Sequence, residues 1–102
     1  MKRLILFAFV LALGFAVQAI AEETVKIVSC LPRTGSAKAQ TDTIVNGIRM
    51  AFEEAGWKAG DFKVVYEDWD DATATAGQWD AVQVQGNADR AVKDTDVMVV
   101  IG

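Results

Sequence analysis

The sequence predicts an α/β protein built on a parallel sheet, with the element order βαβαβ. Three apolar, β-branched segments (residues 24–30, 62–68 and 97–101) alternate with two segments of helical periodicity (residues 41–55 and 81–93). Strands that alternate with helices of this length indicate parallel strands joined by crossover helices. Right-handed crossovers then predict the strand order 2-1-3, with the first strand in the centre and the two helices on opposite faces.

The first helix is predicted from apolar side chains that recur on one face. These are Ile44, Ile48, Ala51, Phe52 and Ala55, and their spacing is that of an amphipathic helix. Thr41 or Asp42 is expected to cap its start, because a short side-chain oxygen reaches the free amides of a first turn. Gly56 is expected to end the helix.

The second half of the chain carries its own boundary signals. A polar stretch over residues 70–77 is expected to be a connection, and Asp80 is expected to cap the second helix. Gly86 lies inside that helix and should weaken it by about 1 kcal/mol. The strand at 97–101 is apolar throughout, which is typical of a strand covered on both faces.

The N-terminus has the three-part pattern of a secretory signal peptide. Lys2 and Arg3 precede an apolar run over residues 4–17, and small residues follow at the positions that a signal peptidase reads. A membrane anchor would need roughly 18 or more uninterrupted apolar residues, and Gln18 breaks the run early. We therefore expect residues 1–21 to be a cleaved signal peptide and the mature protein to be exported to the periplasm.

The composition of the mature region, residues 22–102, excludes some classes of function. It holds 14 acidic and 8 basic residues, because Lys2 and Arg3 lie in the leader, and so carries a net charge of −6. This acidity argues against nucleic-acid binding, which selects for clustered Lys and Arg. The single cysteine, Cys30, cannot form an internal disulfide and is expected to be a small buried hydrophobic residue.

A ligand is expected at the carboxyl edge of the sheet. Open α/β sheets bind ligands where neighbouring connections run in opposite directions, which here is the point between the first and third strands. The loop at Pro32–Gln40 lies there. Thr34 and Ser36 bring hydroxyls, Gly35 allows close backbone approach, and the following helix start favours an anionic group such as a carboxylate. The alternative is that these residues only turn the chain and cap the helix.

Other conspicuous side chains are expected to be structural. One acidic cluster consists of Glu67, Asp68, Asp70 and Asp71. It could hold Mg²⁺, but the favoured interpretation is that these residues lie in a solvated loop. Arg33 could pair with an acid, but a solvated surface arginine is expected. The three tryptophans are expected to pack over the ends of the sheet: Trp57, Trp69 and Trp79. With no His, no G-x-S-x-G and no P-loop, no catalytic set, metal or cofactor is predicted.

Several motifs together resemble a known family. They are Lys26-Ile27-Val28, Leu31-Pro32-Arg33-Thr34-Gly35, Asn46-Gly47-Ile48-Arg49-Met50-Ala51, Glu67-Asp68 and Val99-Val100-Ile101-Gly102. This combination resembles the branched-chain amino-acid-binding proteins of ABC importers, which are type I periplasmic binding proteins of the leucine-binding-protein family. The resemblance covers residues 24–102.

The resemblance implies a two-lobed fold that closes on a small ligand like a hinged clamp. In this family the closed form is recognised by an inner-membrane permease, and the loop at Pro32–Gln40 corresponds to the first ligand-binding loop. Position 40 matches a place where relatives of known leucine specificity carry an aromatic residue, and Gln40 departs from that pattern. Thr34, Gly35, Ser36 and Gln40 are therefore the predicted ligand-proximal residues.

Two further expectations follow. The predicted third strand would be a sheet edge with both faces apolar, which invites aggregation, so we expect residues 22–102 to be the first part of an incomplete lobe of a longer chain. The leading function is a non-catalytic solute-binding component of an ABC importer for a branched-chain amino acid or similar small polar metabolite. The alternatives are a ligand-sensing extracellular module of a receptor and an exported metal-dependent enzyme that uses the acidic cluster.

Overall fold

The computed structural model describes residues 20–102, so the predicted signal peptide at 1–21 lies almost wholly outside the described residues. The elements in chain order are β1 (Thr24–Leu31), α1 (Lys38–Glu54), β2 (Lys58–Ala59), β3 (Phe62–Asp70), β4 (Ala72–Thr73), β5 (Gln78–Trp79), α2 (Ala81–Lys93) and β6 (Val97–Ile101). Neither helix in this part of the chain is long and apolar enough to cross a bilayer.

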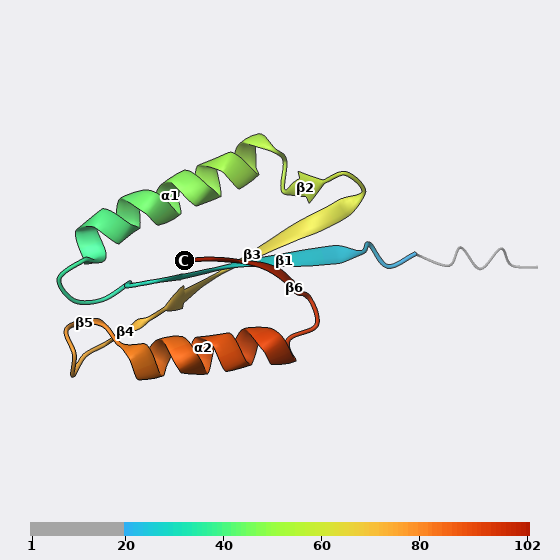
Figure 1. Ribbon diagram of the computed structural model, residues 1–102. Helices are drawn as coiled ribbons and strands as arrows, with labels where there is room; N and C mark the ends of the chain where they lie inside the picture. Colours follow the sequence, from blue (N-terminus) through green and yellow to red (C-terminus); the bar gives the residue numbers. More distant parts are fainter. Residues whose placement is uncertain (1–19) are drawn as a thin grey trace, which may run out of the picture.

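The main sheet has the order β2-β3-β1-β6. β1 pairs in parallel with β3 on one side and with β6 on the other, so the predicted order 2-1-3 of the three long strands is confirmed. α1 and α2 lie on opposite faces of the sheet (Figure 1), as two right-handed crossovers on either side of a central strand require. The sequence did not predict β2, a two-residue antiparallel strand at the β3 edge.

The core is small and centred on β1. Val28 is fully buried in that central strand, and Val45 and Val64 reach it from α1 and β3. Phe52 adds an aromatic cluster under α1, with ring centroids 5.7 Å from Trp57 and 5.5 Å from Tyr66. The helical face predicted by the apolar periodicity is only partly the face that packs on the sheet. Ile48 and Phe52 are half-buried, but Ile44 is 45% exposed, and the buried residues of α1 are Thr41 and Val45.

The start of the first helix differs from the prediction. α1 begins at Lys38, and its N-cap, Ala37, makes no side-chain capping bond. Thr41 is one turn inside the helix, where its hydroxyl donates to the Ala37 carbonyl oxygen at 3.1 Å. Asp42 caps nothing, because its carboxylate is drawn to the Lys38 ammonium at 2.6 Å. The end is as expected: α1 stops at Glu54, and Gly56 follows with a φ of 65°.

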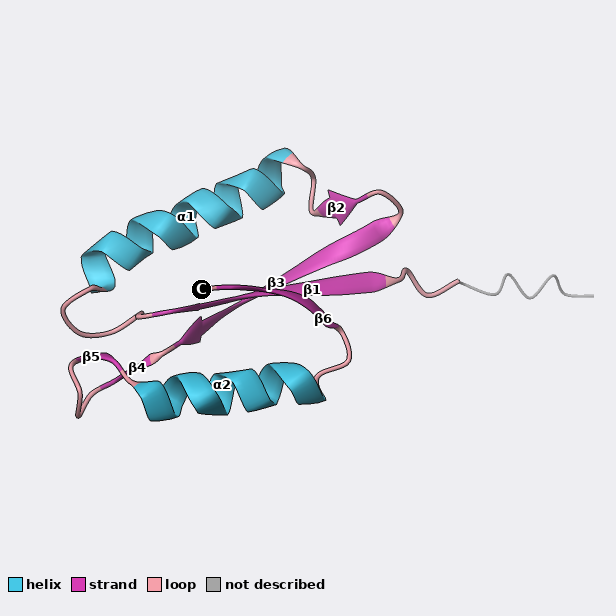
Figure 2. Ribbon diagram, in the orientation of Figure 1, coloured by secondary structure: helices cyan, strands magenta, loops and turns pink. Residues whose placement is uncertain are grey.

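The polar connection before α2 is more ordered than the sequence indicated. β3 extends to Asp70, and β4 and β5 form a small antiparallel hairpin instead of an irregular loop (Figure 2). Asp80 joins this hairpin to α2: its carboxylate accepts the Thr73 hydroxyl at 2.9 Å and the Val82 amide at 2.8 Å. The prediction that Asp80 caps the second helix is confirmed.

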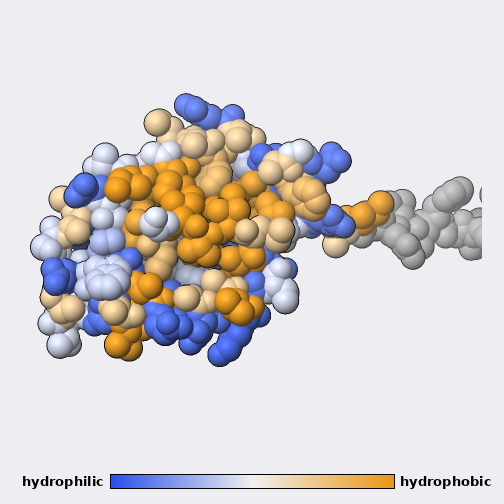
Figure 3. All heavy atoms as spheres, viewed as in Figure 1, coloured by the Kyte–Doolittle hydropathy of each residue, from blue (hydrophilic) through white to orange (hydrophobic). Residues whose placement is uncertain are grey.

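β6 is not covered on both faces, contrary to the expectation from its apolar sequence. Met98, Val99 and Val100 are 67%, 48% and 50% exposed. Hydrophobic residues gather across the middle of the view in Figure 3, over the sheet between the two helices. Exposed apolar groups of this kind occur at interaction surfaces, in ligand-binding grooves and at aggregation-prone edges.

Candidate ligand-binding site

The carboxyl ends of the three long strands meet at one edge of the sheet. The β1–α1 loop, the β4–β5 hairpin and the end of β6 all lie at this edge (Figure 1). Because α1 and α2 leave toward opposite faces, the topological switch point falls between β1 and β6. This is the position at which open α/β sheets bind ligands.

The β1–α1 loop packs against the β4–β5 hairpin. The Ser36 amide donates to the Gly77 carbonyl oxygen at 3.0 Å. Gly35 adopts a φ of 79°, and a Cβ added there would lie 2.1 Å from the same carbonyl oxygen. The Thr34 hydroxyl donates to Asp70 Oδ2 at 3.0 Å. Gly35 therefore has a structural reason to be glycine, whatever else the loop does.

The four predicted ligand-proximal residues lie at the same edge of the sheet, and all four are exposed. Thr34, Gly35 and Ser36 are consecutive and exposed, and Gln40 is exposed in the first turn of α1. The Ser36 and Gln40 side chains face solvent, whereas the Thr34 hydroxyl is engaged with Asp70. Together they form an exposed polar surface beside the switch point.

Arg33 is not the solvated surface residue that the sequence suggested. Its Nε lies 2.7 Å from Asp68 Oδ2, and its Nη1 lies 2.9 Å from Asp42 Oδ1. Its backbone amide donates to Asp70 Oδ1 at 2.8 Å. The sequence could not show this, because the pairs join residues 9 to 37 positions apart. Arg33 ties the β1–α1 loop to both β3 and α1.

The acidic cluster is likewise not a solvated loop. Glu67, Asp68 and Asp70 belong to β3, and all are at least partly buried. Asp68 also accepts the Ser29 hydroxyl at 3.1 Å. Burial alone would raise the pKa of Asp70, but hydrogen bonds from the Ala72 and Arg33 amides and the Thr34 hydroxyl hold that pKa below its usual value. No acidic group in the described residues is arranged with two others to hold a metal ion.

Glu67 lies on the opposite face of β3, where it contacts three other side chains. Its carboxylate lies 3.0 Å from Lys26 Nζ and accepts Trp69 Nε1 at 2.7 Å. The hydrogen bond from Lys26, followed by that from Trp69, lowers the pKa of Glu67. Arg90 completes the group, with its guanidinium 3.9 Å from the centroid of the Trp69 ring and 3.1 Å from Glu67. These contacts bind the last turn of α2 to the sheet.

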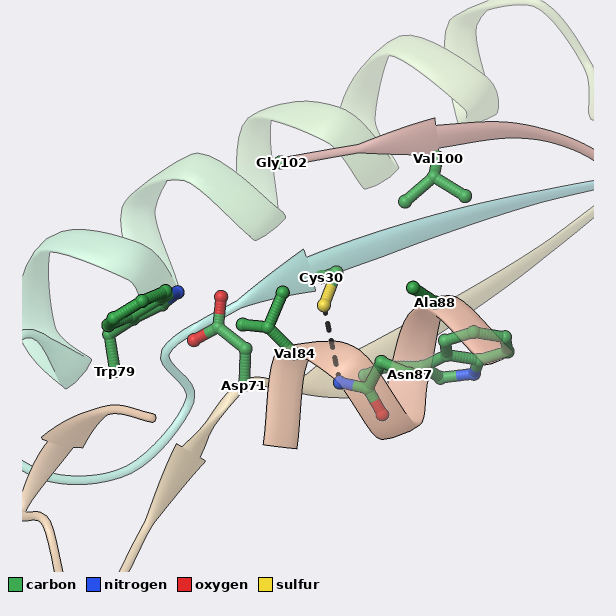
Figure 4. Close-up of a pocket in the computed structure, with 9 residues that line it drawn as sticks. Cys30, Asp71, Trp79, Val84, Asn87, Ala88, Val100 and Gly102 are labelled. Carbon is green, nitrogen blue, oxygen red and sulfur yellow. Dashed lines mark hydrogen bonds between the residues drawn. The ribbon is translucent and has the colours of Figure 1, made fainter. Parts of the chain in front are cut away.

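A pocket of about 260 Å³ opens where α2 meets the ends of β1 and β6 (Figure 4). It is lined by Cys30, Trp69, Asp71, Trp79, Val84, Asn87, Ala88, Val100 and Gly102. None of the four predicted ligand-proximal residues lines it. The sequence analysis missed this pocket, because its walls come from five separate segments; the one available signal was a pair of adjacent aspartates at a strand end.

Asp71 is the unusual group in this pocket. It is 4% exposed, and its Oδ1 is buried and accepts no hydrogen bond within the described residues. Burial raises the pKa of Asp71, and the neighbouring Asp70 carboxylate raises it further. Cys30 is only partly buried, and Asn87 Nδ2 lies 3.2 Å from its sulfur (Figure 4). Burial raises the pKa of this thiol more than the Asn87 contact lowers it.

The tryptophans divide between packing and exposure. Trp69 is 5% exposed under α2, and Trp57 packs on Phe52, so both behave as predicted. Trp79 does not: it is 54% exposed at the end of the β4–β5 hairpin and stands at the mouth of the pocket. An exposed indole beside a pocket is available to stack on a ligand.

Comparison with models of protein families, with curated proteins and with solved structures found no match to this chain. The class of protein is therefore the one that its own architecture defines, an α/β protein with a mostly parallel sheet.

Proposed function

We propose that this chain is the periplasmic solute-binding component of an ABC importer. It binds a branched-chain amino acid or a similar small polar metabolite and delivers it, without catalysis, to a permease in the inner membrane. A type I periplasmic-binding-protein lobe of the leucine-binding-protein family is the finer fold that this function implies. The proposal rests on the sequence resemblance and on the architecture, and each part has its own support.

The observation that carries the proposal is the position of the β1–α1 loop. The loop lies beside the switch point between β1 and β6. Arg33 fixes it there through contacts with Asp70 and Asp68, and the Ser36 backbone amide donates to the Gly77 carbonyl oxygen. A ligand-binding loop must be held in place by residues that do not themselves bind ligand. The exposed Ser36 and Gln40 side chains, presented from this fixed loop, are then free to contact a solute.

The exposed face of β6 supports the view that this lobe is completed by further structure. Met98, Val99 and Val100 expose apolar surface along an edge strand, and an uncovered apolar edge is a liability that proteins normally avoid. We propose that additional β–α units continue the sheet beyond β6, and that a second lobe provides the other side of the cleft. On this view residues 22–102 alone bind the solute more weakly than micromolar, because half of the cleft is missing.

The test is calorimetric titration of the protein recovered from the periplasm. Leucine, isoleucine, valine and a set of small polar metabolites are added in turn. We expect saturable binding of at least one solute, weakened several-fold by Gln40→Ala. The matched control is Glu54→Ala, which removes an exposed side chain from the far end of the same helix. If no solute binds, or if both variants weaken binding equally, the proposed role of the β1–α1 loop is wrong.

A further inference from the structure

A series of hydrogen bonds connects the sheet beneath α1 to the β1–α1 loop. The Tyr66 hydroxyl lies 2.7 Å from the Ser29 hydroxyl, which donates to Asp68 Oδ1 at 3.1 Å. Because a hydroxyl has one proton, Tyr66 is the donor in its contact with Ser29. Asp68 Oδ2 accepts a hydrogen bond from Arg33 Nε at 2.7 Å. We call these four residues the Tyr66–Arg33 network, since it begins in the middle of β3 and ends in the loop.

The Tyr66–Arg33 network is shielded from water. Ser29 is fully buried, and the side chain of Asp68 is 14% exposed. The Tyr66 ring packs against Phe52 of α1, with ring centroids 5.5 Å apart. Hydrogen bonds that are excluded from water polarise one another and are stronger together than singly. All of these contacts are made between β1, β3 and the loop, so the network is complete within the described residues.

Arg33 holds the loop at both of its ends. Its Nε contacts Asp68 in β3, and its Nη1 lies 2.9 Å from Asp42 Oδ1 in α1. All four predicted ligand-proximal residues lie between Arg33 and Asp42 in the sequence, and all four are exposed. The direction in which the guanidinium group points therefore influences how these residues are presented to a solute.

Filling the core does not require a hydroxyl at position 29. An apolar side chain of similar size would fill this buried position without needing hydrogen-bond partners. What the Ser29 hydroxyl adds is direction, because it bonds one oxygen of the Asp68 carboxylate while Arg33 bonds the other. Charge-assisted hydrogen bonds of this kind restrict geometry as well as contributing energy. The Ser29 hydroxyl therefore restricts the orientation of Asp68, and through it that of Arg33.

We propose that Ser29 and Tyr66 are positioning residues for the solute site. They act through Asp68 and Arg33 to hold the β1–α1 loop in the conformation that binds the solute. Because Ser29 is fully buried, it does this without touching the solute. The inference rests on the function proposed above, and it extends that site from the exposed loop to two hydroxyls between the sheet and α1.

The test compares Ser29→Ala, Tyr66→Phe and Asp68→Asn in the protein purified from the periplasm. NMR measures the exchange of the Arg33 Nε proton with water and the amide shifts of residues 34–40, and calorimetry measures the dissociation constants of leucine, isoleucine and valine. In Ser29→Ala we expect faster exchange, displaced loop amides and binding weakened about threefold or more, since one hydrogen bond corresponds to about this factor. The changes should be largest in Asp68→Asn and smallest in Tyr66→Phe, following the order of the network.

Val28→Ala is the matched control, because it separates positioning from stability. Val28 precedes Ser29 in β1 and is also fully buried, but its side chain lies on the opposite face of the sheet. Val28→Ala should destabilise the fold at least as much as Ser29→Ala and yet leave the Arg33 exchange rate and the solute affinity unchanged.

Two results would overturn the positioning role. One is an unchanged Arg33 exchange rate in Ser29→Ala, and the other is an equal change in Val28→Ala. If Ser29→Ala does not fold, Tyr66→Phe carries the same comparison, because it removes only a hydroxyl and keeps the ring against Phe52. Absence of binding by every solute would refute the proposed function, and the exchange rates would still decide whether the network positions the loop.

Discussion

Two neighbouring carboxyl groups at the carboxyl edge of the sheet have opposite surroundings. Asp70 faces the β1–α1 loop, where two backbone amides and the Thr34 hydroxyl hydrogen-bond its oxygens. Asp71, the next residue, turns toward α2, where its buried Oδ1 accepts no hydrogen bond among the described residues. The pKa of Asp70 is lowered and that of Asp71 is raised.

The difference separates a carboxyl group whose oxygens the fold satisfies from one that has an unsatisfied oxygen. On the Asp70 side, the protein supplies its own donors, so the carboxylate fixes the loop and has little left to offer a ligand. On the Asp71 side, Oδ1 of the carboxyl group is buried and accepts no hydrogen bond within the described residues. Unsatisfied buried polar groups are rare in folded proteins, and each one calls for a specific explanation. The predictions below test this contrast, from the largest expected effect to the smallest.

Gly35→Ala should be the most damaging single change on the structural side. The added Cβ would meet the Gly77 carbonyl oxygen and would force a side chain into a positive φ, at a combined cost of about 3 kcal/mol or more. Gly47→Ala is the matched control in α1: it meets nothing within 4 Å and should stabilise the helix by about 1 kcal/mol. Urea unfolding followed by circular dichroism measures both. Equal effects of the two variants would show that the loop does not pack on the hairpin as described.

Arg33→Ala should be the next in size. It leaves Asp68, whose side chain is 14% exposed, without its cation, and should destabilise the fold by about 1–3 kcal/mol. Lys38→Ala breaks the exposed pair with Asp42 and should cost less than about 0.5 kcal/mol. Thermal unfolding of the two variants compares a partly buried pair with an exposed one. A loss for Lys38→Ala as large as that for Arg33→Ala would contradict the structural role of Arg33.

The two aspartates should have opposite effects on the pH dependence of stability. Because the pKa of Asp70 is lowered by folding, its contribution is present above the usual aspartate range and is lost as pH falls through the lowered value. Because the pKa of Asp71 is raised by folding, the fold loses stability as pH rises from the usual range through the raised value.

At neutral pH, therefore, Asp70→Asn should destabilise the protein and Asp71→Asn should stabilise it. For both variants, the difference in the free energy of unfolding from the unsubstituted protein should shrink at acidic pH. There the carboxyl groups are protonated in the folded and unfolded states alike. Urea unfolding across a pH series measures them. A destabilising Asp71→Asn at neutral pH would mean that the carboxylate has a partner after all.

The sequence predicted the features that depend on local patterns. Hydrophobic periodicity located α1, α2 and the three long strands, and the handedness of crossovers predicted their order. Asp80 was recognisable as a cap because capping involves residues two and three positions away. The start of α1 was misplaced, since Asp42 is drawn to Lys38 and Arg33 instead of to free amides.

The features that depend on distant contacts were not predictable. Arg33 meets Asp68 across 35 positions. The sequence predicts a solvated loop for the acidic residues because nothing local shows their partners. The pocket also depends on contacts between distant parts of the sequence, because β1, α2 and β6 form it only after the sheet is assembled. The function and the four loop residues remain predictions, supported by where the loop lies.

The most direct test of the central claim is the intact mass and cellular location of the native protein. An antibody against residues 22–102 recovers it from separated periplasmic, membrane and cytoplasmic fractions. The account predicts a periplasmic protein that begins at Glu22 and whose mass is several times that of residues 22–102, as a complete two-lobed clamp requires. A protein that retains Met1 in another fraction, or a periplasmic protein with the mass of residues 22–102 alone, would contradict it.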